Sequence, residues 1–394
     1  WLCLAMIITG AALHRAERFK ALSYYDVDAG IASFYTEEAF QFRHTRMVAD
    51  DEAIPMFDKK PQWPEGIMPF RELTLLQEYL HGMSFRLFSI FFEHVSLYMF
   101  LVYFIAFFSC LAVVAVFFCV RALGGRPWPA LYISALYAFT GAAFGRVQFY
   151  ELEATAFPLM ALSFAAGLYA LRDRSPYSIV PAAISGVCLA VALASWHFTR
   201  FYVLMFWAAM AGAFLFAGGR RHRFDTAIVI LAFVALTGVL SPAMRNSGLL
   251  FSPAVLAGGL VALVLFVDVK SSMNFFSRIF LLTIGAALIV FILSLGAENS
   301  AYGHVWGLLK YKILNLLVKP GNPGLLPFEG RLLWNGPFNT PPFYFLIYRF
   351  GLLLPVALIA LARFIKNRRS EALFEELVVV FLAVMFFGAN IMAQ

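Results

Sequence analysis

The sequence predicts an all-α, polytopic membrane protein with about eleven transmembrane helices and two long external loops. Three observations lead to this fold class: the composition, the long apolar runs and the placement of the cationic residues. Of the 394 residues, 62% are hydrophobic and only 13% are charged, and the mean hydropathy is +0.78. A soluble domain is about 45–50% apolar and about 25% charged. Disorder is excluded as well, because a disordered chain has low hydrophobicity.

The apolar runs alternate with short connectors along most of the chain. A run of about 20 residues is long enough to cross the hydrocarbon core as a helix. We interpret residues 1–13 as the end of a first span. The further predicted spans are 94–120, 128–144, 152–171, 178–195, 197–217, 225–243, 249–267, 276–296, 342–363 and 373–392. Two polar segments interrupt this order, a first external loop at 14–84 and a second at 297–341. We expect the first loop to carry one or two short helices along the membrane.

The cationic residues fix the predicted orientation, because Arg and Lys favour cytoplasmic loops. With segment 14–84 outside, the inside connectors hold Arg121, Arg126, Arg172, Arg174, Arg220, Arg221, Arg223, Lys270, Arg363, Lys366, Arg368 and Arg369. The short outside loops hold only Arg146, Arg200 and Arg245. The long loops therefore face the exoplasmic side, whether periplasmic, extracellular or ER-lumenal. The net charge of +7 indicates anchoring to the bilayer and not a nucleic-acid partner.

Acidic residues gather on this same predicted face. The first loop contains the pairs Asp26/Asp28 and Glu37/Glu38, and the connector before residue 152 ends in Glu151 and Glu153. Ordinary solvated acids, or acids that favour a helix N-terminus through its dipole, would explain each pair alone. Carboxylates that converge on one face are instead candidate ligands for Mg²⁺ or Mn²⁺.

The residues after Glu37 form a recognisable pattern. Glu37 is followed by Phe40, Phe42-Arg43 and Thr45-Arg46, and later by Phe57-Asp58 and Trp63-Pro64-Glu65-Gly66. This pattern resembles the first external loop of the catalytic subunit of oligosaccharyltransferase, a member of the GT-C class of lipid-dependent glycosyltransferases. That family usually has Asp where this chain has Glu37. Its second external loop carries an acid-x-acid pair after an Arg, as Glu151 and Glu153 follow Arg146 here.

The resemblance implies a GT-C bundle, with residues 1–394 as its transmembrane domain. It also implies an inverting glycan transfer from a polyprenyl pyrophosphate or phosphate to an asparagine of a polypeptide acceptor. Glu37, Glu151 and Glu153 would hold the Mn²⁺ or Mg²⁺ ion, and Glu37 and Glu329 would engage the acceptor amide. Arg43 and Arg146 would contact the donor phosphate. The C-terminal soluble domain of that family, with its Trp-Trp-Asp-Tyr-Gly-type motif, has no counterpart in this sequence.

Three alternatives come from other functional classes. A related GT-C enzyme would use a polyprenyl-phosphate sugar on lipid or on Ser/Thr acceptors. A non-catalytic relative is favoured only by Glu37 in place of Asp. A transporter would carry charges near the bilayer midplane, and the inner parts of the apolar runs carry almost none. If Glu37 is not a ligand, Asp26 and Asp28 are the remaining candidates.

Overall fold

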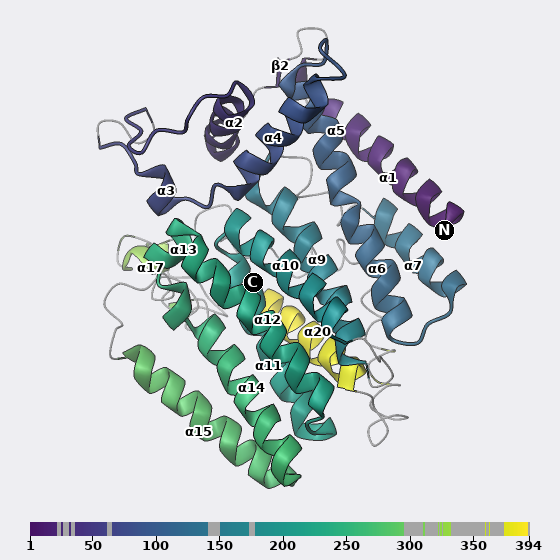
Figure 1. Ribbon diagram of the computed structural model, residues 1–394, viewed down its shortest axis with the longest axis vertical. Helices are drawn as coiled ribbons and strands as arrows, with labels where there is room; N and C mark the ends of the chain where they lie inside the picture. The colour runs from purple at the N-terminus through teal and green to yellow at the C-terminus, as the bar shows by residue number, and fades with distance from the viewer. Residues whose placement is uncertain are drawn as a thin grey trace. The chain divides into compact units, whose positions relative to one another are not determined.

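The computed structural model describes most of the chain up to residue 294 and short pieces beyond it (Figure 1). The described residues are 1–21, 25–26, 31–32, 36–60, 65–140, 150–172, 178–294, 310–311, 322, 324, 326–331, 359, 362 and 374–392. The chain divides into two compact units, and each is described here by itself. The first unit is Trp1–Val203 with Arg221–Gly259, and the second is Leu204–Arg220 with Leu260–Gln394.

Helices make up nearly all of the described structure. Those that begin in the first unit are α1 (Leu2–Lys20), α2 (Thr36–Ala49), α3 (Pro69–Glu72), α4 (Leu76–Ser89), α5 (Leu97–Ser109), α6 (Leu111–Ala122), α7 (Pro127–Phe139), α9 (Leu152–Leu171), α10 (Ile179–Ser195), α11 (Thr199–Ala217), α12 (Arg221–Leu240), α13 (Pro242–Asn246) and α14 (Pro253–Ser271). Helices α11 and α14 continue into the second unit, which also contains α15 (Phe275–Ser294), α17 (Phe328–Arg331) and α20 (Phe374–Met392).

The predicted fold class is confirmed. Among the described residues, 6 helices are long and apolar enough to cross a membrane, and α10 is a shorter apolar helix. They are Leu97–Ala122, Leu152–Leu171, Thr199–Ala217, Arg221–Leu240, Pro253–Ser271 and Phe275–Ile292. The predicted span at 94–120 coincides with the two consecutive helices α5 and α6, and each of the other predicted spans between 128 and 296 and at 373–392 overlaps a helix. The span at 342–363 and most of the loop at 297–341 lie outside the described residues.

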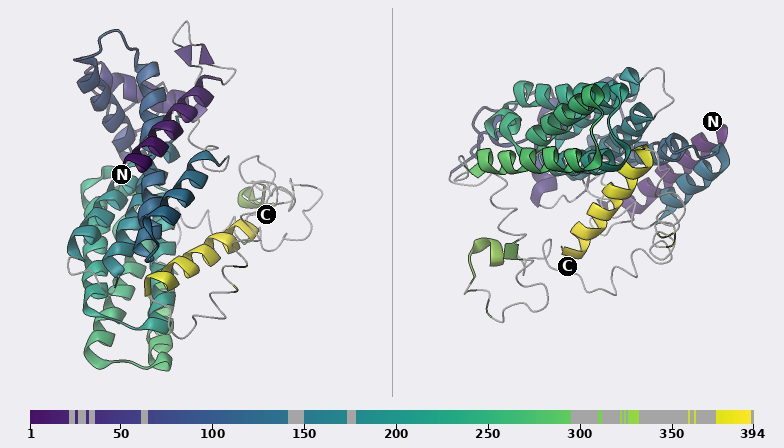
Figure 2. Two further views of the ribbon diagram at one scale, coloured as in Figure 1. Left: turned by 90° about the vertical axis from the view of Figure 1, so that its right-hand side faces the viewer. Right: turned by 90° about the horizontal axis from the view of Figure 1, so that it is seen from below.

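The first external loop contains more helices than the one or two that the sequence predicts. Helices α2 and α3 lie within residues 14–84, and α4 begins there and ends at Ser89. The loop also contains an antiparallel pair of two-residue strands, β1 (Tyr25–Asp26) and β2 (Ile31–Ala32). Helix α1 also continues to Lys20, beyond the predicted end at 13. Its buried Arg15 donates a hydrogen bond of 2.5 Å to Ser109 of α5 and thereby links the two helices. Helices α1 and α5 run side by side in each view (Figures 1 and 2).

The centre of the first unit is a stack of α6, α9, α10 and α12. Without a hydrophobic driving force between helices in lipid, small residues and interhelical hydrogen bonds hold such a stack together. The Oγ atoms of Ser163 in α9 and Ser185 in α10 lie 3.0 Å apart, and Ser185 Oγ also lies 2.8 Å from the Ser163 carbonyl oxygen, to which it can donate. One residue later, a Cβ on Gly186 would lie only 2.5 Å from the ring of Phe233. Close approach of α10 and α12 therefore requires glycine there.

In the second unit, one buried carboxylate joins three helix ends. Asp268, near the end of α14, accepts N–H bonds from Gly219 at 2.6 Å and from Met273 at 2.8 Å. Arg278 of α15 donates to the same carboxylate from Nε at 3.2 Å and from Nη2 at 3.3 Å. Gly218, which ends α11, has a φ of 70°, a conformation that favours glycine. Asp268 thus fixes the turns that leave α11 and α14.

We predict that Asp268→Asn lowers the stability of the second unit by about 3 kcal/mol, because Arg278 loses its buried counter-charge. The thermal unfolding of the protein in detergent measures the change. The control is Asp225→Asn, which breaks the exposed 3.0 Å pair with Arg221 and should cost about 0.5 kcal/mol or less. Equal melting temperatures for the two variants would contradict the structural role of Asp268.

Candidate active site

Helix α2 carries the motif that the sequence analysis singled out, and its residues divide between two sides. Phe42, His44, Thr45 and Val48 are buried, which matches one face of a helix. Phe42 stacks on Tyr98 with ring centroids 4.2 Å apart. The motif residues after Glu37 thus attach α2 to the rest of the first unit. The backbone of Glu37 lies in the first turn of α2, but its side chain lies outside the described part of the chain.

Arg43 and His44 meet the carboxylate of Asp58. Arg43 donates from Nη1 to Oδ2 and from Nη2 to Oδ1, the latter at 3.2 Å, and His44 Nε2 lies 3.4 Å from Oδ2. Burial raises the pKa of Asp58, but the hydrogen bonds from Arg43 and the Lys60 N–H outweigh it, so its pKa lies below the ordinary value. The pKa of His44 is lowered by burial and by the Arg43 charge. Asp58 therefore stays ionised beside a neutral imidazole.

The position of Asp58 beside α2 also explains why the motif contains Gly66. Asp58 and Ile67 form an antiparallel bridge with backbone hydrogen bonds of 2.8 and 2.9 Å. Gly66, just before Ile67, has a φ of 71°, and a Cβ there would lie 2.7 Å from Phe57 and 2.8 Å from the Asp58 carbonyl. Glycine is therefore required for the turn that brings Asp58 to α2. Trp63 and Pro64 lie outside the described residues.

The acidic pair predicted as metal ligands lies at the start of α9. Glu151 is the N-cap residue and Glu153 lies in the first turn, and both side chains are half-buried. Carboxylates are favourable there because the helix dipole presents positive charge at its N-terminus. Among the described residues, no group of three or more His, Cys, Asp or Glu side chains could hold a metal ion. The convergence of Glu37 with this pair therefore stays a prediction.

Tyr150, immediately before Glu151, links α9 to the two loop helices. Its hydroxyl lies 2.5 Å from Thr45 Oγ1 of α2 and 3.1 Å from His81 Nδ1 of α4. On the other side of the imidazole, His81 Nε2 lies 3.2 Å from Thr155 Oγ1 of α9. All four side chains are at most 1% exposed. The structure thus brings together α2, α4 and the acidic end of α9 at one buried polar junction.

Helix α4 buries polar side chains and exposes apolar ones, which is the reverse of a surface helix in a soluble protein. Gln77, Glu78 and His81 are buried, whereas Met83 and Leu87 are exposed by 60% and 65%. An exposed apolar face is typical of a helix that lies at a membrane interface. The buried Glu78 Oε2 has no hydrogen-bond partner among the described residues. Burial raises the pKa of Glu78 from 4.5 to about 8, so this carboxyl is neutral at pH 7.

Several predicted site residues cannot be compared with this junction. The backbone of Glu329 lies in α17 of the second unit and that of Asp26 lies in β1, but neither side chain is described. Arg146 and Asp28 lie outside the described residues. Arg43 is placed, and its guanidinium contacts Asp58 while 29% of its side chain remains exposed. Its contact with a donor phosphate stays a prediction.

Tyr150, Glu78, His81 and Asp58 were not among the site residues predicted from the sequence. A usable signal was present for two of them. Glu78 and His81 are three residues apart on a short helix whose other positions are mostly apolar, and polar residues at helical spacing share a face. Tyr150 offered no signal, because a tyrosine before a span is usually read as an interfacial anchor.

An apolar cavity of about 540 Å³ lies within the first unit, between the segment around α3 and α4 and the helices α10, α12 and α13. Its walls include Leu73, Tyr79, Val191, Leu236 and Leu240. Arg71, which follows the lining residue Phe70 in the sequence, donates from Nε to Asn246 Oδ1 at 3.1 Å, and Asn246 Nδ2 donates to the Arg71 carbonyl at 3.2 Å. This reciprocal pair fastens α3 to α13.

We predict that Glu78→Gln changes how stability depends on pH. Between about pH 4.5 and pH 8, the folded protein retains a proton on Glu78 that the unfolded chain has lost. The free energy of unfolding then falls by up to about 1.4 kcal/mol per pH unit over this window. The glutamine of the variant does not titrate, so its free energy of unfolding lacks this decrease. The melting temperature of the variant relative to that of the wild type should therefore rise from pH 5 to pH 8.

The control for this measurement is Glu93→Gln, which removes the charge of an exposed glutamate in the connector after α4. Its melting temperature should differ from the wild type by the same small amount at every pH. A Glu78→Gln curve parallel to the wild-type curve would show that Glu78 is not buried as a neutral acid.

Comparison with solved structures identifies the fold. An archaeal oligosaccharyltransferase, AglB from Archaeoglobus fulgidus in complex with an inhibitory peptide and a dolichol-phosphate, is similar to this chain with a TM-score of 0.65 and 17% identity, over 99% of this chain and 48% of that one. The apo form of the A. fulgidus oligosaccharyltransferase has a TM-score of 0.64 at 16% identity, with 99% and 48% covered. Its complex with Zn and sulfate has a TM-score of 0.54 at 14% identity, with 98% and 50% covered. The chain spans about half the length of these structures.

No curated protein matches the sequence. At the identities found, the structural similarity shows the fold alone, which is the GT-C glycosyltransferase fold of a multi-pass membrane protein. A family model named Dpy19, described as Q-cell neuroblast polarisation, matches residues 52–314. This match includes α4, Tyr150, Glu151 and Glu153 and extends over more than half of the sequence. The chain belongs to the Dpy19 family.

Proposed function

We propose that the protein transfers a sugar from a polyprenyl-phosphate carrier to a polypeptide acceptor. The observation that carries the proposal is the buried junction at which Tyr150 joins the motif helix α2 and helix α4 to the acidic end of α9. Acidic residues beside this junction would lie at the end of a membrane-spanning bundle, where a lipid-linked donor and a peptide could both reach them. The GT-C fold and the AglB complex with a dolichol-phosphate and a peptide support the same substrate classes.

The family match favours mannose as the sugar and a carbon atom as the acceptor, because the Dpy19 family is of the C-mannosyltransferase type. Among protein side chains, the indole of tryptophan has the most electron-rich ring carbons, so it is the acceptor that we propose. An asparagine acceptor with a larger glycan is the second candidate. It is supported by the pattern from Glu37 to Arg46 and by the similarity to the A. fulgidus oligosaccharyltransferase.

Glu37, Glu151 and Glu153 would hold a divalent cation, and the ion would neutralise the departing phosphate. Carboxylate oxygens suit Mg²⁺ and Mn²⁺, and the two glutamates at the start of α9 need further ligands to complete such a site. Arg146 would contact a phosphate oxygen. Arg43 pairs with Asp58 and would hold residues 57–58 against α2. The exposed part of the Arg43 side chain would face the phosphate. Glu329 would orient the acceptor. We place this chemistry on the exoplasmic face.

We further propose that the apolar cavity beside α4 takes part of the isoprenoid chain. Its volume of about 540 Å³ lies within the range of ligand sites. Its walls belong in part to α10 and α12, which are apolar helices of the bundle, so a lipid chain could enter from the bilayer. Two of its lining residues, Thr237 and Ser241, carry hydroxyl groups.

We predict that Glu37→Gln reduces transfer to below about 1% of the wild-type rate, a loss typical of removing a preorganised charge from an active site. Glu37→Asp should keep measurable activity, because it retains the charge and shortens the side chain by one methylene. The full-length protein is assayed with Mn²⁺, with polyprenyl-phosphate mannose or a lipid-linked oligosaccharide as donor, and with a tryptophan peptide or an Asn-x-Thr peptide as acceptor. Mass spectrometry identifies the modified residue.

Glu52→Gln, at an exposed glutamate just after α2, is the matched control and should retain full activity. Full activity of Glu37→Gln would remove this residue from the mechanism and leave Asp26 and Asp28 as candidates. Modification of the asparagine peptide alone would select the second candidate function. Transfer to a lipid or a hydroxyl alone would overturn both peptide acceptors.

We predict that Leu236→Trp raises the KM for the lipid donor about tenfold, a loss of about 1.4 kcal/mol of binding, with little change in kcat. The indole would occupy the cavity from the α12 side. Val239→Trp serves as the control, since Val239 lies on the same helix, is 51% exposed and does not line the cavity. An unchanged KM in Leu236→Trp would exclude the cavity as the isoprenoid site.

A further inference from the structure

The hydroxyl of Tyr150 is the centre of a hydrogen-bonded chain that passes through three helices. It runs from Thr45 of α2 to Tyr150, on to His81 of α4, and ends at Thr155 of α9, with successive distances of 2.5, 3.1 and 3.2 Å. Tyr150 and Thr155 are both attached to α9, one before Glu151 and the other after Glu153. The acidic turn of α9 is therefore held at both of its ends by the same imidazole.

The protonation states of His81 and Tyr150 in this hydrogen-bonded network follow from their burial. Burial lowers the pKa of His81 to about 3, so the imidazole is neutral and has one N–H donor and one acceptor nitrogen. Burial also raises the pKa of Tyr150 far above its ordinary value, so the phenol keeps its proton. If His81 Nδ1 donates, Tyr150 donates on to Thr45. If His81 Nε2 donates to Thr155, Tyr150 donates to Nδ1 and accepts from Thr45. In either arrangement the hydroxyl makes two hydrogen bonds, one as donor and one as acceptor.

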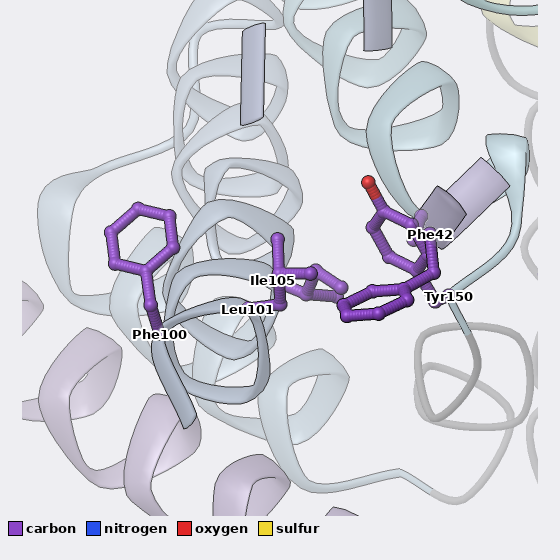
Figure 3. Close-up of a cluster of buried hydrophobic side chains, with 6 residues drawn as sticks. Phe42, Phe100, Leu101, Ile105 and Tyr150 are labelled. Carbon is purple, nitrogen blue, oxygen red and sulfur yellow. The ribbon is translucent and has the colours of Figure 1, made fainter. Parts of the chain in front are cut away.

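The surroundings strengthen these hydrogen bonds. The ring of Tyr150 packs in a buried cluster with Phe42 of α2 and with Leu101 and Ile105 of α5 (Figure 3). The ring of His81 meets Phe104 edge-on at 5.1 Å. In such an apolar setting a satisfied polar network is rigid, and an unpaired member costs free energy. Loss of the Tyr150 hydroxyl would leave both Thr45 and His81 with one hydrogen bond fewer.

We propose that Tyr150 and His81 are positioning residues that hold the acidic turn of α9 in register with the motif helix α2. This inference rests on the proposed function in one respect, namely that Glu37, Glu151 and Glu153 act together. Thr45 lies eight residues after Glu37, which is about 12 Å along a helix. The Thr45–Tyr150 hydrogen bond is thus a direct polar link between the helix that carries Glu37 and the residue that precedes the acidic turn of α9.

The experiment compares Tyr150→Phe with Tyr202→Phe in the full-length protein. Tyr202 also loses a hydroxyl that bonds to α9, but its partner is the Met160 carbonyl, at 3.2 Å and beyond the acidic turn. We expect Tyr150→Phe to increase amide hydrogen exchange in residues 151–156 about tenfold and to leave exchange in α10 unchanged. We also expect kcat to fall about tenfold or more, since small misplacement of catalytic groups is costly, with the donor KM nearly unchanged. Tyr202→Phe should change neither quantity.

A second pair of variants keeps the test informative if Tyr150→Phe folds poorly. Thr45→Val and Thr155→Val each remove one hydrogen bond of the chain and conserve side-chain shape. Each should produce a smaller change of the same kind. The losses in kcat for Thr45→Val and Tyr150→Phe should combine to less than the sum of the separate free-energy changes, because both act on one network.

The outcomes separate the two proposals. Increased exchange with unchanged kcat would overturn the positioning role and leave the network with a structural role alone. A lower kcat with unchanged exchange would overturn it as well, because Tyr150 would then act directly and not through α9. Absence of sugar transfer by the wild type would refute the proposed function, while increased exchange in Tyr150→Phe would still support anchoring of the acidic turn.

Discussion

In a helical membrane protein, every polar group that is removed from water needs a partner inside the protein. The junction of α2, α4 and α9 gathers four such groups. Thr45, His81, Tyr150 and Thr155 are each at most 1% exposed and each hydrogen-bonded to another member of the group. Because the partners come from three helices, the network forms only when the loop helices dock on the bundle. The shape of the candidate active site thus depends on the satisfaction of these groups.

The buried carboxyl of Glu78 is accommodated in a different way, as a neutral group. It lies one turn before His81 on α4, but its Oε2 has no partner within the described structure, and the side chain remains neutral because its pKa is raised to about 8. At Asp58 the chain provides the Arg43 guanidinium and the Lys60 backbone N–H instead, and that carboxylate remains charged. One short stretch of sequence therefore holds a buried neutral acid and a buried ionised acid. The difference is set by the donors that the fold places around each.

The sequence allowed the bundle to be predicted well, because hydropathy reports directly on burial in lipid. The helices from α5 to α15 lie where the apolar runs predicted them. The predicted end of α1, at residue 13, lies before the observed end. A hydropathy scale assigns the charged Arg15 to a loop, but in the structure Arg15 is buried against Ser109. The motif that α2 carries and the acidic pair at the start of α9 were also identified from local patterns. The junction between them was not, because Tyr150 meets Thr45 across 105 positions of sequence, and no local pattern encodes that contact.

The two kinds of similarity found for this chain bear on different parts of the molecule. Packing of apolar helices depends on small residues at close contacts, such as Gly186 against Phe233, and tolerates wide exchange of the remaining apolar residues. A GT-C bundle can therefore persist at 17% identity to AglB without keeping the same acceptor. The Dpy19 match covers the polar elements from Glu52 to α15, which include the proposed site residues Glu151 and Glu153. Acceptor chemistry belongs to such polar elements, since only side chains that touch the reacting groups discriminate between a carbon and a nitrogen nucleophile. For this reason the family match weighs more than the structural similarity in choosing between tryptophan and asparagine.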